Sequence, residues 1–175
     1  MASEQVKMPV ALPFDFRDIQ RISITACGTA SYAGYVAKYW FERLARVPVE
    51  LDVASEFRYR EAPLRKGDLA IFISQSGETA DTLAAMEEGR RKGATIWSIV
   101  NAIGSQAMRV ADGTISMQTG PEIGVASTKA FTAPLADQYM LAILLADLRG
   151  VIDDGTRRSL VSDLRLVPDL VGRTL

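Results

Sequence analysis

The clearest chemical feature of the chain is a short loop rich in hydroxyl groups, Ser74-Gln75-Ser76-Gly77-Glu78-Thr79. The loop follows a continuously apolar run, and helical spacing begins at or near Thr79. A helix N-terminus presents unpaired N–H groups and roughly half a positive charge. Gly77 lets the backbone approach a ligand closely, and short hydroxyl side chains can complete the shell around an anion. The loop is therefore predicted to bind a phosphate dianion without help from a lysine.

Helix capping is the plainer interpretation of the same loop. Ser76 or Thr79 could accept a hydrogen bond from the first turn of the helix and do nothing else. Three hydroxyls and a glycine directly after a buried strand favour the anion site. Glu78 is expected to point away from a bound phosphate, because two adjacent anions repel each other.

A second loop with glycine and hydroxyl groups, Cys27-Gly28-Thr29-Ala30-Ser31, also opens a helical segment. Thr29 and Ser31 could cap that helix or bind sugar oxygens. Cys27 has no base available in this chain, so we expect it to be a small buried side chain and not a nucleophile.

The third candidate loop covers residues 120–129 and contains two glycines and a proline before a long helical segment. Either Ser127 or Thr128 is expected to be the N-cap of that helix. Glu122 and Lys129 are its charged residues, and they could be solvated or paired with each other.

Composition excludes several kinds of chemistry. The chain has no histidine, so it cannot by itself supply a Ser-His or Cys-His nucleophile or a histidine-based metal site. Its single cysteine excludes an intrachain disulfide and favours a reducing, cytoplasmic setting. With 20 basic and 21 acidic residues, the chain has no general field for nucleic acid or an anionic membrane. The glycines match neither dinucleotide nor P-loop patterns, and we expect no metal or cofactor.

Neither the polar N-terminal segment nor the most apolar segment of the chain carries a targeting or membrane signal. The N-terminal residues 1–7 are polar and precede no apolar run, unlike a signal peptide. The most apolar stretch, residues 140–148, contains Asp147 and is too short to cross a bilayer, so we expect a buried helix there.

Strand-like and helical patterns alternate along the chain. The run at residues 68–74 is continuously apolar after its first residue, which is typical of a parallel strand covered on both faces. Strands are expected at 21–28, 49–53, 68–74, 95–100 and 113–117, and helices at 31–46, 55–59, 79–92, 105–110 and 127–149. Pro134 is expected to kink the last helix or to lie within its first two turns, and Pro168 to interrupt a helical tail at 155–175.

This alternation predicts an α/β fold with a parallel sheet between two layers of helices, α/β/α. In such folds ligands bind outside the carboxyl ends of the strands, near a topological switch point. The segments directly after Cys27, Ile73, Val100 and Met117 are therefore the candidate site.

Four motifs together resemble the isomerase part of the glucosamine-6-phosphate synthases, the isomerizing glutamine–fructose-6-phosphate aminotransferases. They occur in the family's order across about residues 20–150. The motifs are Ala26-Cys27-Gly28-Thr29, Ala54-Ser55-Glu56-Phe57-Arg58-Tyr59, the loop Ser74 to Thr79 with Ala80-Asp81-Thr82-Leu83, and Glu122-Ile123-Gly124-Val125-Ala126-Ser127-Thr128-Lys129-Ala130-Phe131-Thr132.

The resemblance implies a sugar isomerase (SIS) domain, with five parallel strands, that binds a hexose 6-phosphate. By this resemblance Ser74, Gln75, Ser76 and Thr79 bind phosphate and sugar, and the backbone around Val125 contacts the sugar together with Ser127. The family often has serine directly after its Cys-Gly-Thr string; this chain has Ala30 there, followed by Ser31.

The resemblance also implies what lies outside the chain. Family members carry an N-terminal glutaminase domain and two SIS subdomains, and this chain resembles only the first subdomain. The family's general-base glutamate, catalytic lysine and ring-opening histidine belong to the second, so we expect no catalytic residue here. The expected division is a leader or linker at 1–20, an SIS domain at 21–150, and a helical linker at 151–175 toward the second subdomain.

The first hypothesis is thus a subdomain that binds fructose 6-phosphate or glucose 6-phosphate without converting it. Its parent would make glucosamine 6-phosphate from fructose 6-phosphate and glutamine for amino-sugar synthesis, with a homodimer expected. One alternative is a non-catalytic sensor or regulatory SIS module. Another is a small stand-alone phosphosugar isomerase that takes a base from a neighbouring subunit, with Glu122 or Glu78 as the nearby carboxylates.

Overall fold

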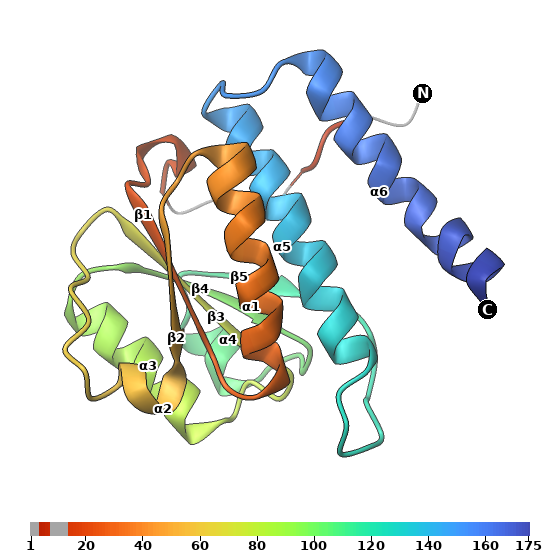
Figure 1. Cartoon of the computed structure of the whole chain (residues 1–175). Helices are drawn as coiled ribbons and strands as arrows, with labels where there is room; N and C mark the ends of the chain where they lie inside the picture. Colours follow the sequence, from red (N-terminus) through yellow and green to blue (C-terminus); the bar gives the residue numbers. More distant parts are fainter. Residues whose placement is uncertain (1–3, 8–13) are drawn as a thin grey trace.

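The computed structural model describes residues 4–7 and 14–175, and Figure 1 shows the course of the chain. The rest of the expected leader, residues 1–3 and 8–13, lies outside the described residues. Among the described residues, no helix combines the length and apolar character needed to cross a membrane.

A single sheet of five parallel strands forms the middle layer of the domain (Figure 1). Its strand order is β2-β1-β3-β4-β5, so the predicted parallel sheet is confirmed. β3 lies at the centre and is buried along its whole length, as its apolar run predicts. The strands are β1 (Arg21–Ala26), β2 (Val49–Val53), β3 (Asp68–Ser74), β4 (Thr95–Val100) and β5 (Gly113–Ser116).

Helices cover both faces of the sheet, which completes the expected α/β/α arrangement (Figure 1). One face packs against α1 (Thr29–Trp40), its π-helical continuation (Phe41–Ala45) and α5 (Lys129–Leu148). The other face packs against α2 (Ala54–Phe57), α3 (Ala80–Arg91) and α4 (Gln106–Val110).

Alternation along the strands divides the core into two clusters, because successive side chains of a strand point to opposite faces. Ile71 and Ile73 of β3 belong to the cluster under α1 and α5, whereas Ala70 and Phe72 belong to the cluster under α3. Each helical layer therefore has its own apolar contact with the central strands.

The described residues just before β1 also contribute to the core. A short 3₁₀ turn, Phe16–Asp18, places Phe16 against the buried indole of Trp97, with 5.7 Å between the ring centroids. Ile19 is buried in the same cluster. The packed core therefore includes residues on the N-terminal side of Arg21.

The two prolines within helical segments behave differently from each other. Pro134 lies within the first two turns of α5, one of the two expected positions. The expected interruption at Pro168 was wrong, because α6 (Asp154–Thr174) continues through it. Pro168 is exposed, so the carbonyl that loses its helical partner can be solvated by water, and the helix tolerates the missing N–H.

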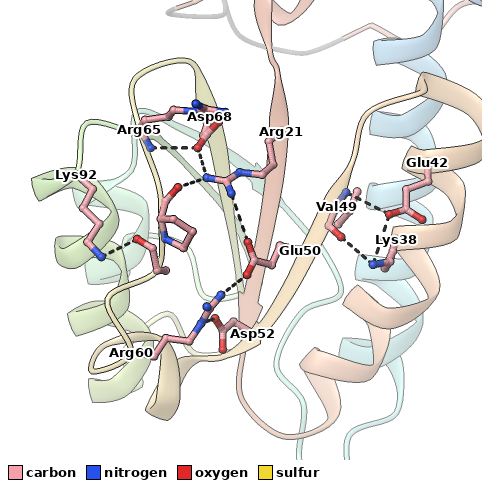
Figure 2. Close-up of polar contacts among 12 residues, drawn as sticks. Arg21, Lys38, Glu42, Val49, Glu50, Asp52, Arg60, Arg65, Asp68 and Lys92 are labelled. Carbon is pink, nitrogen blue, oxygen red and sulfur yellow. Dashed lines mark hydrogen bonds and ion pairs between the residues drawn. The ribbon is translucent and has the colours of Figure 1, made fainter.

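A network of ion pairs ties the first three strands together near one edge of the sheet (Figure 2). Arg21 Nη2 lies 2.6 Å from the fully buried carboxylate of Asp68, and Arg21 Nη1 lies 3.6 Å from Glu50 on β2. Arg60, from the segment between α2 and β3, pairs with both Glu50 and Asp52. The network joins β1, β2 and β3 to the long segment that crosses between them.

Candidate functional site

The hydroxyl-rich loop lies at the carboxyl end of the central strand. β3 ends at Ser74, the loop follows, and α3 begins at Ala80. From β1 the chain passes through α1 to β2 on one side, and from β3 it passes through α3 to β4 on the other. The boundary between β1 and β3 is therefore the topological switch point, where a ligand crevice is expected.

Hydrogen bonds within the loop hold its hydroxyl groups in place. Ser74 Oγ accepts from the Gly77 N–H at 3.0 Å, and Ser76 Oγ accepts from the Glu78 N–H at 3.2 Å. Each hydroxyl acts here as an acceptor and keeps its own O–H for donation to another group. The carbonyl group of Gln75 accepts from Asn101 and Ala102 beyond β4, which anchors the loop to the next strand.

Close packing at Gly77 shapes the turn. Gly77 has a φ of +67°, and a Cβ at this position would lie 2.2 Å from Ser105 Oγ. Only glycine fits both the backbone conformation and the space. The loop is consequently compact and lies directly against the start of α4.

The start of α3 has no side-chain cap. Thr79 occupies the N-cap position, but its side chain makes no capping hydrogen bond among the described residues. The capping interpretation is therefore not borne out for Thr79, and its hydroxyl remains available together with the first N–H groups of the helix. Glu78 is turned away as expected: its Oε1 accepts from the Gln106 N–H of α4 at 2.7 Å.

A polar cavity of about 230 Å³ opens between the loops that follow β1 and β3. Six of the eight predicted binding residues line it, from three different segments of the chain. They are Thr29, Ser74, Gln75, Ser76, Thr79 and Ser127. The tertiary structure thus gathers hydroxyl groups from both sides of the switch point and from the start of α5.

Two predicted residues are not among the described residues that line this cavity. Ser31 Oγ donates to the Gly28 carbonyl at 2.6 Å within the first turn of α1, so its hydroxyl is used locally. Val125 is fully exposed on the loop before α5. A sugar contact by either residue stays a prediction.

The cavity also includes residues that were not among the predicted binding residues: Cys27, Ala30, Ile73, Thr82 and Ala130. Thr82 carries a signal in the sequence, because it lies three residues after Thr79 and shares its face of the helix. Ala30 and Ala130 contribute small apolar walls and carry no polar signal that could have marked them.

Glu122 accepts hydrogen bonds from the start of α5, whereas the sequence left open whether it is solvated or paired with Lys129. Its Oε1 accepts hydrogen bonds from the N–H and Oγ1 of Thr128, both at 2.8 Å, and from the Ala130 N–H at 3.3 Å. These bonds, first of all those from Thr128, lower the pKa of the carboxyl group below its ordinary value. Glu122 thus caps α5 from a distance, while Thr128 occupies the N-cap position without a side-chain cap of its own.

The fold and the site define a known class of protein. The family model of the SIS domain matches residues 15–144. The chain therefore belongs to the SIS domain family, and the fold expected from the four motifs is confirmed.

Several relatives share one name, glutamine–fructose-6-phosphate aminotransferase (isomerizing). The whole chain is 59% identical over 175 residues to a glutamine–fructose-6-phosphate aminotransferase (isomerizing) from Bradyrhizobium diazoefficiens. It is 52% identical over 165 residues, 94% of this chain, to the enzyme of that name from Brucella abortus. It spans only 29% and 27% of these two proteins.

A solved structure agrees with these relatives. The C-terminal domain of glucosamine-fructose-6-phosphate aminotransferase from Francisella tularensis superposes with a TM-score of 0.91 at 36% identity. The match covers 98% of this chain and 48% of that one. The resemblance inferred from the four motifs is confirmed, and the chain corresponds to roughly half of that C-terminal domain.

Proposed function

We propose that this chain is the hexose-6-phosphate-binding SIS subdomain of a glutamine–fructose-6-phosphate aminotransferase (isomerizing). The loop from Ser74 to Thr79 binds the phosphate, and Thr29 and Ser127 border the sugar. The parent protein makes glucosamine 6-phosphate from fructose 6-phosphate and glutamine. This activity is carried over from the names of relatives that are more than three times as long as the chain.

One observation carries the binding proposal. Hydroxyl groups of Ser74, Ser76 and Thr79 border the same cavity as the uncapped N-terminus of α3. Such an arrangement stabilises a dianion through N–H groups, the helix dipole and neutral O–H donors. The near-neutral charge of the chain agrees with recognition by local geometry and not by a basic patch.

Isothermal titration of the chain with fructose 6-phosphate and with glucose 6-phosphate tests the proposal. We expect binding of at least one of them, and we expect the double variant Ser76→Ala/Thr79→Ala to lose it. Each lost hydrogen bond to a charged partner costs about 1.5–3 kcal/mol, which is on the order of tenfold to a hundredfold in affinity.

The matched control is Ser159→Ala/Ser162→Ala, which removes two exposed hydroxyls from α6. This variant should bind like the unmodified chain. No binding to a folded chain at millimolar sugar phosphate would contradict the proposal, as would equal binding by the two double variants.

Catalysis is proposed to need the rest of the parent protein. Neither Glu78 nor Glu122 is among the described residues that line the cavity, and both carboxylates are engaged by backbone N–H groups. No observation therefore favours the stand-alone isomerase. The purified chain should not interconvert aldose and ketose phosphates, and measurable conversion that is lost in Glu122→Gln would overturn this view.

The proposed partners are a second SIS subdomain, a glutaminase domain and a second copy of the parent, in the cytoplasm. The short share of the curated relatives that the chain spans supports the first two. Exposed apolar side chains on α1 and α6, such as Tyr39 and Leu170, support an assembly. Sedimentation of the parent that returns only monomer at micromolar concentration would argue against the homodimer.

A further inference from the structure

Thr82 is a buried hydroxyl residue at the edge of the phosphate cavity. The residue lines the cavity, yet it is only 2% exposed. Its Oγ1 is sealed from solvent and has no hydrogen-bond partner among the described residues. Buried hydroxyl groups are normally paired, because an unpaired one destabilises the folded protein.

The position of Thr82 explains what could pair with it. Thr82 is the third residue of α3, one turn after Thr79, in a helix whose first turn has no side-chain cap. An anion held at this helix N-terminus would come within reach of the first turn and of the side chains beside it. No acceptor among the described residues is bonded to the Thr82 hydroxyl in this structure, whereas a phosphate oxygen would be one.

A change of rotamer would redirect this hydroxyl. Threonine occupies two χ1 rotamers in helices, which point its hydroxyl in different directions. In this structure the hydroxyl is sealed although the residue borders the cavity. Rotation about χ1 would change the direction of the O–H without moving the backbone.

We propose that Thr82 is a fourth hydroxyl ligand of the bound phosphate, in addition to Ser74, Ser76 and Thr79. Its O–H donates to a phosphate oxygen and gains a hydrogen-bond partner when the ligand is present. This inference rests on the proposed binding of a hexose 6-phosphate. It also adds a determinant of specificity. The hydroxyl strengthens the binding of an anion that has a free acceptor oxygen, and it does not strengthen the binding of an uncharged sugar.

Two substitutions separate a ligand role from a merely structural one. Thr82→Val keeps the shape of the side chain and removes the hydroxyl, whereas Thr82→Ser keeps the hydroxyl and removes the methyl group. Thermal melts without ligand and titrations with fructose 6-phosphate and inorganic phosphate are measured on the unmodified chain and on both variants.

If Thr82 binds the phosphate, Thr82→Val should melt at a higher temperature than the unmodified chain, because the unpaired hydroxyl is gone. It should nevertheless bind fructose 6-phosphate about tenfold more weakly, the loss expected for one hydrogen bond to a charged group. Thr82→Ser should bind within about threefold of the unmodified chain, since it retains the donor.

The possible failures are distinguishable. If Thr82→Val melts higher and binds as tightly as the unmodified chain, the hydroxyl is only a structural defect and the inference is overturned while the proposed function stands. If Thr82→Val and Thr82→Ser weaken binding equally, loss of packing is the cause and the inference is again overturned. If the folded, unmodified chain binds neither ligand, the proposed function and this inference both fall.

Discussion

At the scale of single residues, the main departure from ordinary protein chemistry is a carboxylic acid without a partner. Asp137 on α5 is only 8% exposed, and its Oδ2 has no hydrogen-bond partner among the described residues. Burial raises the pKa of this carboxyl group from 3.8 to about 7. Asp137 is therefore a candidate for the residue that limits the stability of the domain near neutral pH.

Asp137→Asn should stabilise the domain in a pH-dependent way. Between pH 3.8 and about 7 the folded carboxyl retains a proton that the unfolded one has released, so stability falls as pH rises through this window. Above about pH 7 the folded protein bears the full effect of an unpaired charge. We expect the free energy of unfolding of the variant to exceed that of the unmodified chain by little below pH 4 and by on the order of a few kcal/mol at pH 8.

Chemical denaturation at pH 4 and pH 8 measures this difference, with Asp169→Asn on the exposed side of α6 as the control. The control should change the free energy of unfolding by less than about 0.5 kcal/mol at both pH values. A gain for Asp137→Asn that is the same at both pH values would rule out charge burial as its cause.

At the scale of elements, the unit that matters is the strand–loop–helix formed by β3, the loop from Ser74 to Thr79 and α3. Its loop is tied to the next strand through the carbonyl of Gln75, and Gly77 lies against Ser105 at the start of α4. The shape of the loop thus depends on neighbours on both sides. A substitution of Gly77 should therefore lower both the stability of the domain and its affinity for the ligand.

Gly77→Ala should destabilise the domain more than Gly104→Ala. Both glycines have positive φ, +67° and +77°, so both variants meet the same backbone strain of about 1–2 kcal/mol. A Cβ at Gly77 would also lie 2.2 Å from Ser105 Oγ, whereas a Cβ at Gly104 would meet nothing within 4 Å. We expect the free energy of unfolding to fall by at least about 2 kcal/mol more in Gly77→Ala than in Gly104→Ala. We also expect Gly77→Ala to lose phosphosugar binding.

Denaturation midpoints and calorimetric titration of the two glycine variants measure both effects. Gly104→Ala should retain binding, because nothing crowds its new methyl group. Equal destabilisation of the two variants would show that backbone strain alone, and not the contact with Ser105, accounts for the loss of stability.

At the scale of the whole molecule, the ion pairs that stabilise the sheet and the loop proposed to bind the ligand lie at opposite ends of the strands. The ion-pair network of Arg21, Asp68, Glu50 and Arg60 includes the amino end of β3 (Figure 2), whereas the loop from Ser74 to Thr79 follows its carboxyl end. The seven residues of β3 separate Asp68 from the loop by about 20 Å at roughly 3.3 Å per residue. Changes in the network should therefore alter stability and leave the cavity intact.

Asp68→Asn should lower the free energy of unfolding by about 3 kcal/mol. The carboxylate is fully buried and accepts from Arg21 and from the Arg65 N–H, and removal of one partner of a buried pair leaves the other charge uncompensated. Asp15→Asn, which breaks the exposed pair with Arg17, should leave the denaturation midpoint almost unchanged. Sugar-phosphate affinity should be equal in the folded forms of both variants, and a loss of affinity in Asp68→Asn would show that the two ends of the sheet are coupled.

Much of this protein follows from the sequence by itself. The apolar run of β3, the helix that starts after Thr79 and the glycine in the loop are local signals, because apolar composition, helical spacing and the tolerance of glycine for a positive φ can each be read from a few adjacent residues. The four motifs further identified the family. These features were sufficient to predict the layered sheet and most of the cavity.

Only the tertiary structure decided which of these residues meet. Strand order places the loop after β1 beside the loop after β3, and packing directs Thr82 into the cavity wall while Ser31 turns back to Gly28. It also buries the Oδ2 atom of Asp137 without a hydrogen-bond partner in the described part of the chain, and it lets α6 continue through Pro168. Such outcomes depend on contacts between segments far apart in the chain. The hydroxyl-rich loop was thus visible in the sequence, but the place of Thr82 beside it was decided by packing alone.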